Sequence, residues 1–152
     1  MIIPLSKLFI GQKGKIHKLS LKSEDLNNRF ISMGMIPGKM IELVHISPFG
    51  DPLVFKIGER KLVLRKSEAA NIFVEVEYKI ENLFEIESGD YEVIHLEGGR
   101  AFHEEMKKMG ILEGIKIKKV NKYGNKIIVE IKGDTLEIGR GKAEKIFCKK
   151  VA

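Results

Sequence analysis

An internal repeat constrains this chain of 152 residues more than any other feature. Three segments recur in the same order, at spacings of 75, 76 and 74 residues. The matched segments are 8–14 with 83–89, 33–38 with 109–114, and 62–73 with 136–147. Because three ordered matches at nearly one spacing do not arise by chance, we predict two copies of one unit, spanning residues 1–77 and 83–152.

Each copy is predicted to consist of short strands and one helix. In the first copy Ser23 is a suitable N-cap, and Glu24 and Asp25 follow where acidic groups favour the helix dipole. This pattern predicts helices over residues 24–33 and, in the second copy, 101–109. The predicted strands are 16–19, 40–46, 53–57, 61–64 and 72–76, then 91–96, 116–120, 126–131, 135–138 and 146–149.

Four glycines are predicted to shape the turns that follow the helices. Gly34 and Gly110 come directly after apolar helical faces, so we expect them to end the helices in the left-handed region. Gly38 and Gly114 then lie in the turns that lead to the next strands. An open sheet of five strands would expose its edges, so this mainly β pattern predicts a small closed barrel in each copy.

The charge distribution and the cysteine content argue against several classes of protein. The net charge of +6 is spread along the chain beside acidic residues, whereas nucleic-acid binders show a clustered basic face. Cys148 stands alone, which excludes an intramolecular disulfide and fits a reducing compartment. There is no signal-peptide pattern, and no apolar run approaches the roughly 20 residues that span a bilayer. We therefore expect a cytoplasmic protein without a nucleic-acid partner or membrane span.

A set of residues in the first copy, taken in order, resembles a known family. These residues are Leu8, Gly11, Gly14 and Ile16, the runs 33–38 and 48–52, and the segment 62–74 with Arg65, Glu68 and Ala69. Over nearly all of residues 5–76 they resemble the FeoA core domain. The second copy resembles it more weakly, because Glu113 replaces Pro37, the run 122–126 replaces 48–52, and Gly139 replaces Arg65.

The resemblance implies both a fold and a function. It implies two tandem SH3-like β-barrels, each with one short α-helix. It also implies a cytosolic partner of FeoB, the membrane transporter of ferrous iron that carries a cytosolic GTPase domain. A similar barrel occurs in DtxR-like repressors, but this chain has no room for a helix-turn-helix. We therefore expect an accessory protein that modulates ferrous iron uptake, and its self-association is left open.

The loop 48–52 is the predicted partner-binding site. It contains Pro48, Phe49, Gly50, Asp51 and Pro52, and Arg65 is assigned to the same site. Two prolines and a glycine exclude a paired strand and restrict the loop before binding. Two interpretations of Phe49 remain: it folds back over the barrel end, or it is exposed for a partner.

The second copy lacks both of these prolines, so its loop is expected to be more flexible. Its role is then that of a covalently attached barrel partner. The alternative is that its loop makes a separate basic contact with an anionic membrane surface.

No catalytic motif is present, so an enzyme is not expected and no cofactor is required. The alternative function is a soluble protein that binds Fe(II) or responds to it. His95 and His103 flank one loop, near Glu97 and Glu104, and these are ligand types that Fe(II) accepts. The competing interpretation is that both histidines are surface residues. His17 and His45 are expected to be partly buried and hydrogen-bonded, and Cys148 to be packed within a strand.

Overall fold

The computed structural model describes residues 1–151, which form two compact units. Unit one is Met1–Lys79, and unit two begins at Ile80. Unit one contains β1 (Ile2–Pro4), η1 (Leu5–Lys7), β2 (Lys13–Leu19), α1 (Glu24–Ser32), β3 (Met40–Ile46), β4 (Leu53–Ile57), β5 (Arg60–Leu64), α2 (Lys66–Ala69) and β6 (Ile72–Glu75). Unit two contains β7 (Ile80–Asn82), β8 (Gly89–Leu96), α3 (Arg100–Lys108), β9 (Lys116–Tyr123), β10 (Lys126–Ile131), β11 (Asp134–Gly139), α4 (Arg140–Ala143) and β12 (Ile146–Lys150).

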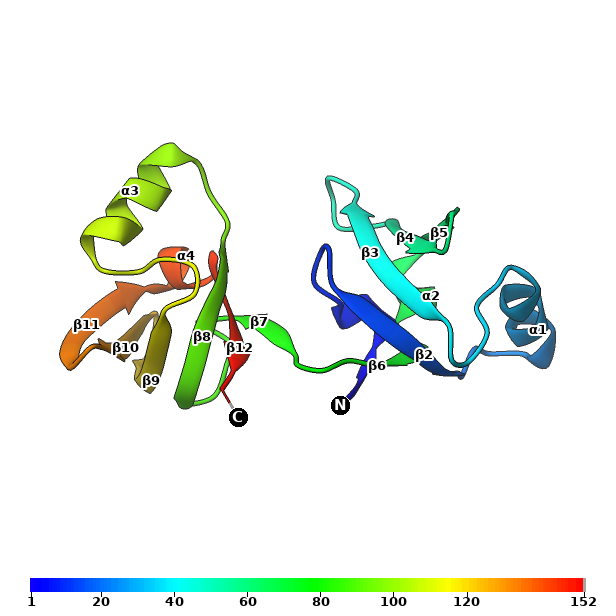
Figure 1. Ribbon diagram of the computed structural model, residues 1–152, viewed down its shortest axis with the longest axis horizontal. Coiled ribbons are helices and arrows are strands. Elements are labelled where there is room, and N and C mark those ends of the chain that lie inside the picture. Colours follow the sequence, from blue (N-terminus) through cyan, green and yellow to red (C-terminus); the bar gives the residue numbers. More distant parts are fainter. Residues whose placement is uncertain (152) are drawn as a thin grey trace. The chain divides into compact units, whose positions relative to one another are not determined.

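Each unit is one antiparallel sheet that curves around its own core (Figure 1). The strand order is β1-β6-β2-β3-β4-β5 in unit one and β11-β10-β9-β8-β12-β7 in unit two. The predicted mainly β class with an SH3-like arrangement is confirmed, but the predicted closure is not. Within residues 1–151, β5 does not pair with β1, and β11 does not pair with β7. Each sheet therefore keeps two edge strands.

Six strands per unit are present where five were predicted. The additional strands are β1 and β7, each of three residues. They open their units in the sequence and pair with the last strands of those units, β6 and β12. Three residues are too few to show the alternation of apolar and polar side chains that marks a strand in the sequence. They are extended because they pair with a strand that is distant in the sequence. Of the predicted strands, 40–46, 53–57 and 126–131 match the observed bounds.

Strand pairing also corrects the alignment of the first repeated segment. In unit one the amide of Gly11 donates to the carbonyl of Leu43 (2.7 Å). In unit two Gly89 pairs with Lys119, which occupies the position of Leu43 in the ladder. Because Gln12 also bonds Leu43, accepting from its amide (3.3 Å), Gly89 corresponds to the pair Gly11 and Gln12 and not to Gly14, which lies opposite Ile41. The sequence allowed both alignments because apolar residues recur every three positions in each segment.

The two main helices begin and end for different local reasons. The hydroxyl of Ser23 accepts a hydrogen bond from the amide of Leu26 (3.1 Å), as an N-cap should, whereas Gly99 provides no side-chain cap to α3. Each helix ends one residue earlier than predicted. The glycines after them have the expected positive φ angles: 102° at Gly34, 95° at Gly38, 81° at Gly110 and 92° at Gly114.

We expect Gly110→Ala to destabilise unit two by about 1–2 kcal/mol, because a Cβ atom is disfavoured in the left-handed region. No heavy atom lies within 4 Å of the position of this added Cβ, so backbone conformation alone sets the cost. Gly141 is the matched control, since its added Cβ also meets open space and its backbone is helical. Thermal unfolding followed by circular dichroism tests the pair. Equal melting temperatures for the two variants would contradict the backbone argument.

Each unit buries its own set of aliphatic and aromatic side chains, mostly from the inward faces of its strands. The largest fully buried side chains in unit one are Phe55, Leu5, Ile16, Met35, Ile41, Leu43, Leu64 and Ile72. Fully buried large side chains in unit two include Leu83, Met106, Ile111 and Ile117. The chain has no tryptophan, and Phe55 is the largest side chain that is completely buried.

Candidate partner-binding loop

The loop between β3 and β4 is braced by its own backbone. The amide of Ser47 donates to the carbonyl of Pro52 (3.2 Å), and the amide of Gly50 donates to the carbonyl of Ser47 (2.7 Å). A third bond ties the loop to the next element, because the carboxylate of Asp51 accepts from the amide of Lys66 (2.9 Å). The loop is therefore fixed at its base and attached to the start of α2.

Phe49 lies at the tip of this braced loop with its side chain in water. The residue is 98% exposed, the highest value among the exposed large hydrophobic residues. This excludes the interpretation in which Phe49 folds back over the end of the sheet. An exposed aromatic ring on a fixed loop is the kind of group that anchors protein interfaces.

Arg65 lies beside the same loop. Its backbone amide donates to the carboxylate of Glu68 (2.8 Å), which holds the first turn of α2. Arg65 immediately precedes Lys66, the residue that bonds Asp51, so the structure brings the predicted site residues 48–52 and 65 together. The side chains of Arg65 and Lys66 are both exposed.

Exposed apolar side chains also lie on the strands next to the loop. Ile46, at the end of β3, is 40% exposed, and Val63 on β5 is 62% exposed. Val54 on β4 pairs with Val63 and is half-buried. None of these three residues was predicted from the sequence to belong to the site. The signal was available in β5, where Val63 alternates with the buried Leu62 and Leu64.

Unit two has a different structure at the corresponding place. Tyr123 pairs with Lys126, so only Gly124 and Asn125 remain between β9 and β10. The expected flexible loop is thus a tight hairpin, because the missing prolines allow both strands to continue to the turn. Tyr123 is 64% exposed, which gives this end an exposed aromatic residue as well, but with a polar hydroxyl.

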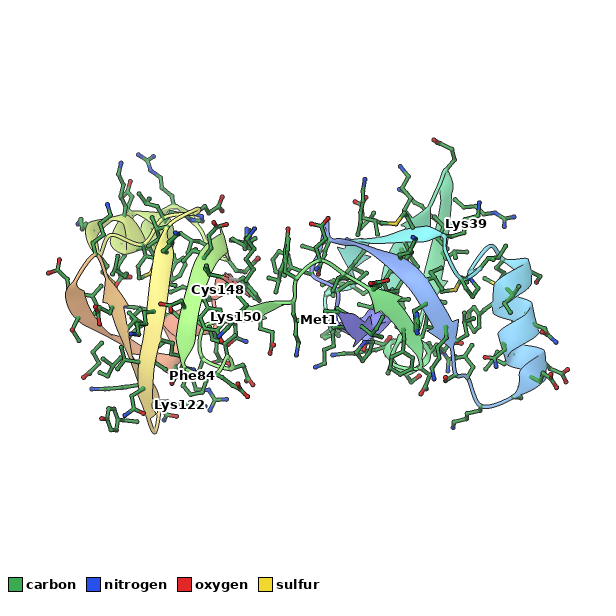
Figure 2. All side chains as sticks on the ribbon, turned by 60° about the horizontal axis from the view of Figure 1, so that its bottom comes forward. Met1, Lys39, Phe84, Lys122, Cys148 and Lys150 are labelled. Atoms are coloured by element: carbon green, nitrogen blue, oxygen red, sulfur yellow. The ribbon has the colours of Figure 1, made fainter. Side chains whose placement is uncertain are left out.

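Cations gather around one ring at this end of unit two. The ammonium of Lys122 lies 3.9 Å from the centre of the Phe84 ring, and the guanidinium of Arg140 lies 4.9 Å from it. Figure 2 shows Phe84 and Lys122 together. Lys119 is buried and donates to the carbonyls of Phe84 (2.7 Å) and Ile86 (2.6 Å). Burial, followed by the charge of Lys122, lowers the pKa of Lys119.

The histidines do not come together in a metal site. His95 on β8 contacts Glu97 (2.7 Å) through one ring nitrogen and Glu113 (3.7 Å) through the other. His103 on α3 bonds the carbonyl of Gly99 (2.9 Å). In residues 1–151 no group of three or more histidine, cysteine or carboxylate side chains is placed to hold a metal ion.

His17 and His45 are exposed, so the expectation that they are partly buried is wrong. His17 follows the inward-facing Ile16 on β2 and therefore points away from the core.

Cys148 lies within β12, packed as predicted and only 1% exposed (Figure 2). Burial raises the pKa of its thiol to about 12. We therefore expect 5,5′-dithiobis(2-nitrobenzoate) at pH 8 to label the native protein at least about 100-fold more slowly than the denatured protein. The measurement is the absorbance of released thionitrobenzoate with and without urea. Rapid labelling of the native protein would show that β12 opens readily.

Comparison with known proteins identifies both units. The family model for the FeoA domain matches residues 3–76 and again 83–150. This chain belongs to the FeoA domain family. It is also similar to the iron(II) transport protein A of Clostridium thermocellum, at 39% identity over 99% of this chain and 89% of that one, with a TM-score of 0.60. A FeoA-like protein from Clostridium acetobutylicum is 32% identical over 50% of this chain and 87% of its own, with a TM-score of 0.45.

The two FeoA domains share their fold but present different chemistry at the corresponding end. The first presents an exposed phenylalanine on a braced loop, and the second a tight hairpin with cations around a buried ring. Among residues 1–151, no helix has the length and apolar character that crossing a membrane requires.

Proposed function

We propose that this protein is a non-enzymatic, cytoplasmic accessory protein of ferrous iron transport that contacts the cytosolic part of a FeoB-like transporter. Membership of the FeoA family supports a role in ferrous iron transport. Similarity to an iron(II) transport protein along nearly the whole chain supports the same role. The contact with the transporter is the mechanism we propose for that role.

The observation that carries the proposal is the exposure of Phe49. Leaving a phenylalanine ring in water forgoes the roughly 1.5–3 kcal/mol that burial of such a side chain provides. The loop beneath the ring is already held by Asp51 and by its own backbone, so docking orders few additional groups. An anchor on a fixed loop is suited to reversible binding of a protein partner.

We assign the contact to unit one, through residues 48–52 and Arg65. Unit two then acts as a covalently attached partner domain, standing in for a second subunit. Its hairpin presents Tyr123 and Lys126, and Lys126 is already paired with Glu137 (3.0 Å). That end therefore has less unsatisfied apolar surface to offer than the Phe49 loop.

Isothermal titration of the full chain into the purified cytosolic part of the FeoB-like transporter tests the proposal. We expect saturable binding with one copy of the chain per transporter domain, and no GTP hydrolysis by the chain alone. A parallel anaerobic titration with Fe(II) tests the alternative function. Tight Fe(II) binding together with no binding to the transporter would replace the accessory role with that of a metal-binding protein.

A further inference from the structure

Strand β5 is a free edge of the sheet of unit one. It pairs with β4 on one side and is the last strand in the order. The free side of an edge strand presents unpaired amide and carbonyl groups, to which another extended chain can bind. The adjoining hairpin shows which groups these are.

The register of the hairpin assigns the free groups to Lys61 and Val63. The two-residue turn at Gly58 and Glu59 is closed by the pair Ile57 and Arg60, which in such hairpins is a hydrogen-bonded pair. Hydrogen-bonded pairs then alternate along β5, so the backbone amides and carbonyls of Lys61 and Val63 point away from β4. A partner strand would bond these two residues.

The side chains around this edge combine apolar surface with positive charge. Val63 is 62% exposed and lies beside Val54 on the outer face. Lys61, Arg65 and Lys66 are exposed, and within residues 1–151 none of them forms an ion pair. These cations discourage pairing between two copies of the same edge and favour an acidic strand.

The corresponding edge of unit two lacks these properties. Its strand β11 carries Thr135 and Glu137 at the positions of Lys61 and Val63. The carboxylate of Glu137 is bound to Lys126 across the hairpin (3.0 Å). A charged pair at this position is a common way to protect an edge strand from further pairing. The two units thus differ at the residues that would meet an added strand.

We propose that an extended acidic segment of the transporter's cytosolic part adds to unit one as a further strand along β5, next to the Phe49 loop. The inference rests on the proposed function, because it specifies how that contact is made. Backbone hydrogen bonds to Lys61 and Val63 give affinity, Val63 receives an apolar side chain, and the neighbouring cations select acidic residues.

Val63→Pro tests this pairing, since proline removes the outward amide without removing a bond to β4. We expect the variant to bind the transporter's cytosolic part at least about tenfold more weakly, while Glu137→Pro, the matched change in unit two, binds like the wild type. Hydrogen exchange by NMR supplies a second readout. The amides of Lys61 and Val63 are expected to become protected when the transporter domain is bound.

The outcomes separate the inference from the proposed function. If the transporter domain binds the wild type and Val63→Pro equally and neither amide is protected, strand addition is wrong but the accessory role stands. If the wild type does not bind, both fail. Protection that appears without the transporter, as the concentration of the chain rises, would make a second copy the occupant and overturn the inference.

Val63→Glu is the second variant, for use if the proline variant misfolds. It keeps the backbone amide, and we expect it to weaken binding because its carboxylate repels an acidic strand.

Discussion

The double variant Phe49→Ala, Asp51→Ala is expected to bind the cytosolic part of the FeoB-like transporter at least about 30-fold more weakly than the wild type. Truncating a central aromatic anchor commonly costs 2 kcal/mol or more, roughly this factor. Loss of the Asp51 carboxylate also releases the amide of Lys66, so the loop is no longer fixed before binding. Isothermal titration with the full chain measures both effects together.

Tyr123→Ala, Lys126→Ala is the matched control, because it changes the corresponding end of unit two. We expect it to bind within about twofold of the wild type, since neither residue belongs to the proposed contact. Loss of binding only in this second variant would assign the contact to unit two. It would then favour the basic hairpin, with Lys122 and Arg140 around Phe84, as the functional surface.

Phe55→Ala is expected to cost about 3–5 kcal/mol of folding free energy, the usual range when a buried phenylalanine is truncated. Phe55 is completely buried and lies between Leu43 and Leu62 in the sheet of unit one. A domain of this size is typically stable by only about 5–10 kcal/mol, so the variant should leave unit one close to unfolding.

Urea unfolding followed by circular dichroism measures this loss, because the chain has no tryptophan to report by fluorescence. The control is Val63→Ala on the neighbouring strand, where the side chain is 62% exposed and the expected change is within about 0.5 kcal/mol. A loss below 1 kcal/mol for Phe55→Ala would mean that the core around β4 tolerates a cavity, contrary to its close packing.

The repeat was predictable because its matched segments recur in order at nearly one spacing. The helices and long strands were predictable because their signals depend on residues close in the sequence. Ser23 caps α1, and Gly34 ends it with a positive φ, as expected. Strand β3 was predicted with its observed bounds from its run of β-branched and apolar residues. These features need no knowledge of the tertiary structure.

Features that depend on distant partners were missed or misassigned. Strand β1 exists only because β6 pairs with it, and the strand ends do not meet to close the sheet. The inward position of Lys119 follows from ladder pairing, which places it where unit one has Leu43. The exposure of Phe49 could not be inferred, because an exposed and a folded-back ring fit the same loop sequence.

Uptake of radioactive ferrous iron by cells that lack this protein tests the central claim most directly. Cells are complemented with the wild type, with Phe49→Ala, Asp51→Ala, or with Tyr123→Ala, Lys126→Ala, at matched protein levels. We expect uptake to change on deletion, to return with the wild type and the second variant, and to remain at the deletion level with the first. Uptake that is the same with and without the protein would contradict its role in ferrous iron transport.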